Sequence, residues 1–264
     1  MKKKISITID SHLLREIDSS VDNIYIRNRS QAIEFLAKNA LGERKTAVIL
    51  AGGPEESLKI GKDFRPTARI GKKTVIELAV EKLRASGFRN IFIIARQHAL
   101  TAMFNILKDG SGYGVKVDYI EEKESSGTAD SLRLARGKIE KTFLVVYSDI
   151  VFSRANIDEI WNSHIKGSSI STLMLTSSNE PSEKGAVTME GSRIIEFSQK
   201  PAETETNLVF SPIFACEPEL LECRGASLEK DIFPRLAEKG LLSGYISAQK
   251  ERHIHSEEDL KSSN

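Results

Sequence analysis

Two glycines directly follow an apolar segment and are the first residues with a recognisable chemical use. Residues 46–50 are continuously apolar after Thr46, and Ala51, Gly52 and Gly53 come next. A strand that ends in glycines predicts a turn whose backbone N–H groups can approach a phosphate, because glycine carries no Cβ. Two glycines alone are a weak signal, so a plain tight turn between a strand and a helix remains the alternative.

Beyond residue 45, short apolar segments alternate with segments of helical periodicity. Strands are expected at 46–50, 90–95, 115–120, 143–147 and 171–175, and helices at 75–83, 101–107, 128–135 and 157–164. This alternation predicts an α/β domain with a mostly parallel, doubly wound, Rossmann-like sheet. Ligands of such sheets bind beyond the carboxyl ends of the strands, where Gly52 and Gly53 are expected to lie.

The first 43 residues follow a different pattern. Isoleucines at positions 5, 7 and 9 alternate with Lys4, Ser6 and Thr8, which predicts a strand with one polar face. Two helices should follow, the first capped by Asp10 and the second by Asn28. Such a unit buries little by itself, and its strand has no partner, so dimerisation through an antiparallel ribbon is expected. The chain is therefore interpreted as two domains, residues 1–43 and 44–264.

A two-stranded ribbon with a polar face fits the major groove of DNA. The start of the second helix, Asn28-Arg29-Ser30, would offer backbone N–H groups and a guanidinium to a DNA phosphate. Over residues 3–42 the unit resembles the ribbon-helix-helix family of DNA-binding proteins, and residues 29–33 look like that family's Arg-Ser-Glu-Ala-Ile signature. A dimerisation arm without a DNA function is the alternative.

The charge distribution supports a division into two parts. The whole chain has 38 Lys and Arg against 37 Asp and Glu, a net charge of +1. Residues 1–45 hold nine basic and six acidic residues, a net +3, so the remainder carries −2. A basic unit doubled in a dimer favours salt-sensitive DNA binding. Two cysteines are too few for a disulfide framework and no apolar run is of membrane-spanning length, so a soluble, cytoplasmic protein without membrane contact is expected.

Further motifs follow the glycine turn in a fixed order. They are Gly127-Thr128-Ala129-Asp130-Ser131-Leu132, Val145-Val146-Tyr147-Ser148-Asp149, Ile195-Glu196-Phe197-Ser198-Gln199-Lys200-Pro201 and Asn207-Leu208. With residues 50–53 at its start, this series resembles the sugar-1-phosphate nucleotidyltransferases over residues 45–260. These enzymes join a nucleoside triphosphate to a sugar phosphate and release pyrophosphate.

The resemblance implies a set of site residues. The nucleotide-binding residues would be Leu50, Ala51, Gly52, Gly53, Gly127 and Thr128. Asp149 would ligate Mg²⁺, and Lys200 and Asn207 would face the sugar phosphate. A carboxylate at the carboxyl end of a strand suits a hard cation, and an ammonium suits a phosphate. Without its flanking motifs, Asp149 could equally cap a helix or lie in a surface turn.

Three positions depart from that family's pattern. Its first loop continues as Gly-Thr-Arg-Leu, whereas this chain has Pro54-Glu55-Glu56-Ser57, with no N–H at the proline and two carboxylates facing polyphosphate. Arg65, or Thr67, stands where the family has a lysine, and Arg65 is the candidate catalytic residue. His253 stands at the second metal-binding aspartate, and imidazole is a poor Mg²⁺ ligand. His253 and His255 could instead form a transition-metal site or belong to a polar surface strand.

These observations favour a DNA-binding transcriptional regulator whose second domain senses a nucleotide or sugar nucleotide and has lost catalysis. The alternative is an active, Mg²⁺-dependent sugar-1-phosphate nucleotidyltransferase with an N-terminal dimerisation or autoregulatory domain. Both interpretations expect a homodimer, and a dimer of dimers on tandem DNA half-sites is compatible with the first.

Overall fold

The structure is a computed structural model that describes residues 5–21, 26–41, 45–124 and 126–261. The chain divides into two compact units, Met1–Arg44 and Lys45–Asn264.

The N-terminal unit contains the two expected helices, α1 (Ser11–Ser19) and α2 (Arg29–Leu41). Asp10 caps α1, because its carboxylate accepts hydrogen bonds from the backbone N–H groups of His12 and Leu13. The expected strand is not formed: residues 5–10 have no regular secondary structure, and Lys4 lies outside the described residues. A β-strand needs hydrogen bonds from a neighbouring strand, and the described part of this unit offers none within one chain.

Four parallel strands form one half of the large sheet, in the order β7-β6-β1-β8. They are β1 (Lys45–Ala51), β6 (Phe88–Ala95), β7 (Lys116–Glu121) and β8 (Phe143–Tyr147). All four were expected from their continuous apolar character, which is typical of strands covered on both faces. Their carboxyl ends lie at one edge, and this edge positions the site described below.

The other half of the nine-stranded sheet is mainly antiparallel, so the expectation of a mostly parallel sheet is wrong for this half. Its strands are β10 (Ser171–Ser177), β11 (Gly185–Glu190), β12 (Arg193–Gln199), β13 (Leu208–Cys216) and β14 (Leu242–Ile246). β13 pairs antiparallel with both β8 and β10, whereas β10 and β14 are parallel. A two-residue turn that includes Gly191, at φ 61°, joins β11 to β12 and makes that pair a hairpin.

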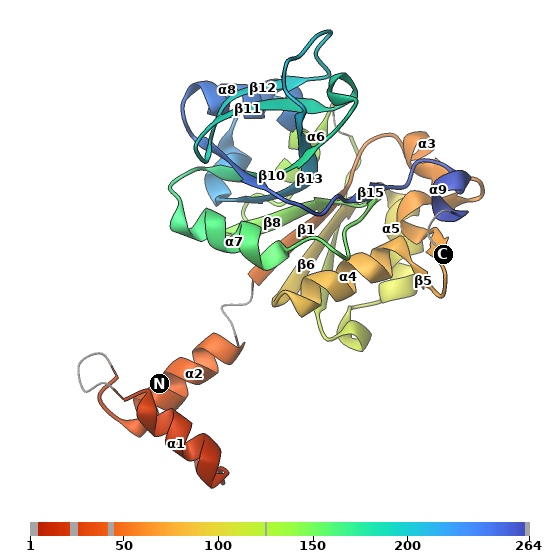
Figure 1. Cartoon of the computed structure of the whole chain (residues 1–264). Coiled ribbons are helices and arrows are strands. Elements are labelled where there is room, and N and C mark those ends of the chain that lie inside the picture. Colours follow the sequence, from red (N-terminus) through yellow and green to blue (C-terminus); the bar gives the residue numbers. More distant parts are fainter. Residues whose placement is uncertain (1–4, 22–25, 42–44, 125, 262–264) are drawn as a thin grey trace. The chain divides into compact units, whose positions relative to one another are not determined.

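Helices cover both faces of the sheet, which gives three layers (Figure 1). On one face, Ala47, Ile49 and Ala51 of β1 share a core with α4 (Val75–Ala85), α5 (Gln97–Leu107) and α7 (Ile157–Lys166). On the other, Val48 and Leu50 share a core with α6 (Thr128–Arg133) and α8 (Phe233–Glu238). The alternation along β1 follows from the two-residue period of a strand.

Shorter elements complete the large unit. The regular ones are α3 (Glu55–Leu58), β2 (Lys59–Ile60), β3 (Asp63–Phe64), β4 (Arg69–Ile70), β5 (Lys73–Thr74), β9 (Ile150–Val151), β15 (Arg252–His253) and α9 (Glu257–Lys261). Single turns of 3₁₀ helix are η1 (Arg65–Thr67), η2 (Ser111–Tyr113), η3 (Pro181–Glu183) and η4 (Pro218–Glu222), and η5 (Leu228–Ile232) is a π-helical turn. Among the described helices, none has the length and apolar character needed to cross a bilayer.

Candidate functional site

The glycine turn after β1 closes around a buried carboxylate. Gly53 donates its backbone N–H to Oε2 of Glu122 at 2.7 Å, and the Ser131 hydroxyl donates to Oε1 of the same side chain. A Cβ on Gly52 would lie 2.4 Å from Oγ of Ser131 and 2.7 Å from Oε1 of Glu122. Close packing therefore requires glycine at position 52. The backbone N–H of Gly53 is already hydrogen-bonded to the Glu122 carboxylate.

Glu122 directly follows β7 at the carboxyl edge of the parallel strands, and only 1% of the residue is exposed. Nε of Arg96 lies 3.8 Å from its Oε2 and compensates its charge. Sequence reasoning did not find either residue. The available signal was their position, since each comes immediately after a strand of the parallel half.

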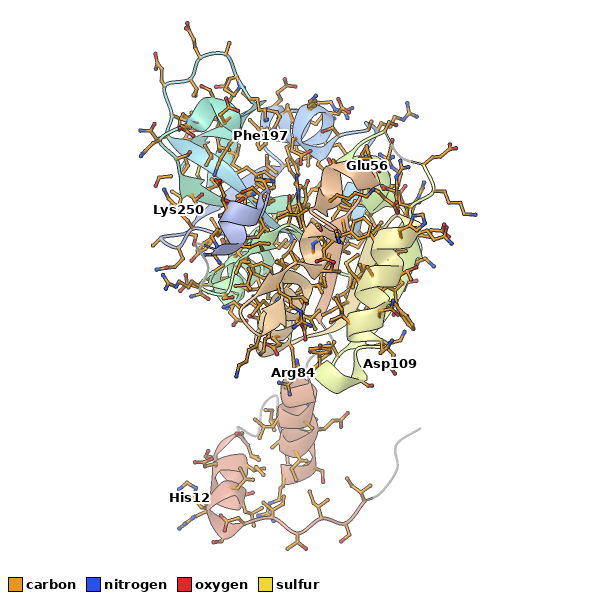
Figure 2. All side chains as sticks on the ribbon, turned by 90° about the vertical axis from the view of Figure 1, so that its right-hand side faces the viewer. His12, Glu56, Arg84, Asp109, Phe197 and Lys250 are labelled. Carbon is orange, nitrogen blue, oxygen red and sulfur yellow. The ribbon has the colours of Figure 1, made fainter. Side chains whose placement is uncertain are left out.

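The unusual first loop, Pro54 to Ser57, folds as the short helix α3 and its connection. Glu55 accepts two hydrogen bonds of 2.9 Å from His98, one from the backbone N–H and one involving Nδ1, and so caps the first turn of α5. Burial opposes ionisation, but these hydrogen bonds hold the pKa of Glu55 below its ordinary value. Glu56 lies at the surface (Figure 2), where it pairs with Lys59 at 2.8 Å. Both carboxylates thus have partners within the protein.

Gly127 and Thr128 lie at the start of α6 and contact residues 226–229, at the beginning of η5. A Cβ on Gly127 would lie 2.6 Å from the Ala226 carbonyl oxygen, so glycine permits this close approach. The Thr128 hydroxyl donates to Oε2 of Glu229 at 2.6 Å and accepts the backbone N–H of Leu228 at 2.9 Å. It therefore supports the turn, and the backbone of Gly127 is the part left to approach a ligand.

Tyr147, at the end of β8, joins the same network by donating its hydroxyl to Glu229. Burial and then the Glu229 carboxylate raise the pKa of Tyr147 well above its usual value. The neutral phenol thus holds Glu229 beside the start of α6.

Asp149 and Arg65 lie together just beyond β8. Nη1 of Arg65 is 3.3 Å from Oδ2 of Asp149 and 2.9 Å from Nδ1 of His255. Asp149 accepts the Ile254 backbone N–H through its own carbonyl oxygen, at 2.8 Å, next to the pairing of β9 with β15. Nε of Arg65 is buried and has no hydrogen-bond partner within the described residues. An unpartnered buried donor beside a carboxylate is an arrangement suited to an anionic ligand.

His253 does not replace the missing carboxylate. Its Nε2 lies 3.2 Å from Oε1 of Glu251, and its ring stacks on His255 with centroids 5.3 Å apart. Across the described residues there is no group of three or more metal-ligating side chains, so the expectation of a transition-metal site finds no support. Mg²⁺ is often held by one carboxylate and by substrate phosphates. Asp149 fits that kind of site, and His253, an imidazole paired with Glu251, does not.

Lys200 and Asn207 lie in another part of the unit. Lys200 follows β12 with φ 50° and donates its backbone N–H to Lys184 O at 2.8 Å, and the Asn207 carbonyl accepts from Ser178. Asn207 lines a cavity of about 730 Å³ whose wall also includes residues of β11 and β12, among them Glu196. Within the described chain, no hydrogen bond or ion pair joins either residue to the glycine turn or to Asp149. The sugar-phosphate assignment of these two residues stays a prediction.

The residues expected to contact DNA are partly engaged within their own unit. Nε and Nη2 of Arg29 each donate to one carboxylate oxygen of Asp18 at 2.7 Å, and this ion pair joins α2 to α1. Asn28 accepts the Gln31 backbone N–H through Oδ1 at 3.0 Å, as a helix cap does. Ser6, Thr8 and Ser30 are exposed, and Lys4 is outside the described residues.

A parallel half-sheet, a glycine turn and an arginine–aspartate pair at one edge are together typical of an α/β domain that handles nucleotides. The sequence pattern of the nucleotidyl transferase family matches residues 46–255. The chain belongs to this family.

Relatives and solved structures agree with that assignment. The chain is 32% identical to mannose-1-phosphate guanylyltransferase 1 of Arabidopsis thaliana over 72% of this chain and 56% of that protein. It is 30% identical to mannose-1-phosphate guanyltransferase of Aspergillus oryzae over 69% of this chain and 52% of that one. It spans about half the length of these relatives.

Two crystal structures share the fold. One, from Bacillus anthracis, is assigned as a glucose-1-phosphate thymidylyltransferase and superposes with a TM-score of 0.74 at 19% identity, covering 83% of this chain and 94% of the other. The other is HddC from Yersinia pseudotuberculosis, with a TM-score of 0.67 at 20% identity, covering 83% and 97%. The family match covers residues 46–255, and none of these similarities supports the ribbon-helix-helix assignment of residues 3–42.

Proposed function

We propose that the chain is a sugar-1-phosphate nucleotidyltransferase. In this reaction a phosphate oxygen of the sugar 1-phosphate attacks the α-phosphorus of a nucleoside triphosphate. The bond from that phosphorus to the β-phosphate oxygen breaks, and pyrophosphate leaves. The observation that carries the proposal is the Arg65–Asp149 pair at the carboxyl edge of the strands, in a chain whose family membership extends over residues 46–255.

The substrates we favour are GTP and mannose 1-phosphate. Two relatives, at 32% and 30% identity, are named as guanylyltransferases for mannose 1-phosphate. A thymidylyltransferase shares only the fold, at 19% identity, so its nucleotide is the weaker candidate.

The roles follow from charge and position. Asp149 would hold Mg²⁺, which supplies positive charge to the phosphates when bound. Arg65, with its unpartnered Nε, binds the triphosphate and stabilises the charge that develops on it. Glu122 acts as a positioning residue, because it fixes the Gly52–Gly53 turn.

The experiment is a pyrophosphate-release assay with Mg²⁺, GTP and mannose 1-phosphate, repeated with the other nucleoside triphosphates and sugar 1-phosphates. Release should require both substrates and should be lost in Asp149→Asn. The control is Asp118→Asn, because the half-exposed Asp118 of β7 forms an ion pair with Lys116 at 2.7 Å and has no role in the proposed reaction. No release with any pair, or equal loss in both variants, would count against the proposal.

A second candidate function is a ligand-sensing DNA-binding regulator, as the N-terminal pattern predicts. The observation in its favour is that several apolar side chains of this unit are uncovered: Ile5 is 75% exposed, Ile7 54% and Leu13 51%. Apolar residues at this exposure are typical of a face that another chain covers. We propose that a second copy pairs with residues 4–9 to form the ribbon.

Two measurements test this second candidate. Sedimentation should show a dimer that Ile5→Lys with Ile7→Lys converts to monomer. Mobility of DNA from upstream of the gene should shift in a salt-dependent way, and Ser6→Ala with Thr8→Ala should reduce the shift. A wild-type monomer, or a shift that the serine and threonine changes leave intact, would remove the regulator from consideration.

A further inference from the structure

A pocket lined by three arginines lies in the large unit, at a place the proposed reaction does not use. Its volume is about 550 Å³, and Arg133, Arg136 and Arg224 line it together with Asp130 and Glu222. We call it the arginine pocket. Its volume lies within the range of small-molecule sites.

The guanidinium of Arg133 is held in place by two backbone carbonyl oxygens and one carboxylate. Nη2 donates to the carbonyl oxygens of Cys223 at 2.9 Å and Gly225 at 2.7 Å, while Nη1 pairs with Asp130. The two carbonyl oxygens orient this guanidinium, and the Asp130 carboxylate compensates its charge. Such pre-orientation lowers the entropy that a ligand's binding would otherwise cost.

The remaining charges favour an anion. Arg136 pairs with Glu222, whereas Arg224 is exposed and forms no ion pair with any residue that the structure describes. A smaller adjoining cavity shares Arg224 and adds Arg235 and Lys239. Arg235 donates to the carbonyl oxygens of Asp231 and Arg224, so its charge is also only partly compensated. Several arginines around one concave site are suited to bidentate binding of phosphate oxygens.

The same segment that lines the pocket also holds the start of α6. The Ala226 carbonyl accepts the backbone N–H groups of Ala129 at 2.8 Å and Asp130 at 3.2 Å. Asp130 in turn accepts from the backbone N–H and hydroxyl of Ser126, next to Gly127. A ligand that shifts the side chain of Arg133 or Asp130 would therefore also shift the turn at Gly127, through these hydrogen bonds.

We propose that the arginine pocket binds a small, soluble phosphate-bearing anion and that its occupancy changes the conformation of the Gly127 turn. Regulation then follows from coupling between two separate sites. This inference is independent of whether the chain turns over a sugar phosphate.

The test uses the full-length ¹⁵N-labelled protein, with inorganic phosphate as the probe at constant ionic strength. NMR should show saturable shifts of the arginine Nε–Hε signals of the pocket and of the Gly127 and Ala129 amides. Arg136→Gln combined with Arg224→Gln should weaken this binding about tenfold or more. Both residues are exposed, so the fold should persist, and unchanged amide signals of β1 and β6 will verify it.

The matched control is Lys166→Gln on α7, which also removes an exposed cation but lies outside the pocket. It should bind phosphate with the wild-type affinity. Absence of saturable shifts, or an equal affinity in the double variant and wild type, would overturn the site. Binding without any change at Gly127 and Ala129 would overturn the coupling.

Discussion

Nη1 of Arg65 lies 3.3 Å from Oδ2 of Asp149, although the two residues are 84 positions apart in the chain. This pair places a permanent positive charge beside Asp149, the carboxylate that we propose as the Mg²⁺ ligand. His255 adds a ring nitrogen 2.9 Å from the same Nη1. Arginine, which stays protonated, can bind phosphate oxygens in pairs, so the site retains an anion-binding group despite the altered first loop.

This relationship predicts the effect of removing the guanidinium. Arg65→Ala should lower kcat for nucleotidyl transfer about 100-fold to 1000-fold, the usual loss when one transition-state donor is removed. Arg65→Lys should recover part of the rate, because the charge remains but the bidentate fork does not. Steady-state kinetics measures both. An Arg65→Ala enzyme with wild-type kcat would show that the guanidinium is only structural.

The glycine turn predicts a stability effect with a clear control. Gly52→Ala should destabilise the large unit by about 1–3 kcal/mol, because its Cβ would overlap Ser131 and Glu122. It should also weaken nucleotide binding. Gly112→Ala has no atom within 4 Å of the added Cβ and should change the free energy of unfolding by less than about 0.5 kcal/mol. Urea unfolding of the two variants tests this, and equal stabilities would contradict the packing argument.

The two carboxylates of the first loop should behave differently. Glu55→Gln should cost about 1 kcal/mol of unfolding free energy, since it weakens the cap on α5. Glu56→Gln should have almost no effect, because Glu56 is 82% exposed and its pair with Lys59 is a surface ion pair. If the Glu56 variant were the less stable of the two, the capping assignment would be wrong.

His164 predicts a pH dependence of stability. Burial lowers its pKa, and the nearby Glu217 carboxylate, 3.3 Å away, opposes the shift only in part. A histidine whose folded-state pKa is lowered binds fewer protons than in the unfolded chain, so stability falls as pH drops below the unfolded value of about 6.5. The loss should continue down to the lower folded-state pKa.

Urea unfolding followed by the fluorescence of Trp161, which lies on the same helix, measures this dependence. His164→Gln removes the titrating group, so the slope of stability against pH below about 6.5 should become shallower. An identical slope in the variant would mean that His164 is not the group responsible.

The sequence was sufficient for the parallel half of the sheet and for β10, but it did not indicate β11, β12, β13 or β14. Buried parallel strands such as β8 are short, continuous apolar runs, and their bounds at 143–147 were predicted as observed. In β12 only Ile194 and Phe197 are buried, with two exposed residues between them, so this strand lacks a continuous apolar run. Its pairing depends on a hairpin turn and on distant strands, which local patterns do not encode.

The site residues also divide into those that local motifs indicate and those that depend on contacts between distant parts of the chain. Motif order indicated Gly52, Gly127 and Asp149, which lie on elements of the carboxyl edge. The contact of Glu122 with Gly53 spans 69 positions and could not be read from spacing. The departure at Glu55 looked like a charge conflict with polyphosphate, because the sequence did not show that His98 binds this carboxylate.

The most direct test of the proposed transfer reaction runs it in reverse. GDP-mannose, Mg²⁺ and ³²P-labelled pyrophosphate are incubated with the full-length protein, and labelled GTP is separated and counted. We predict that the wild type forms labelled GTP together with an equal amount of unlabelled mannose 1-phosphate, and that Asp118→Asn does the same. Asp149→Asn should form no labelled GTP above background. Absence of labelled GTP with GDP-mannose and with every other sugar nucleotide offered would contradict the account.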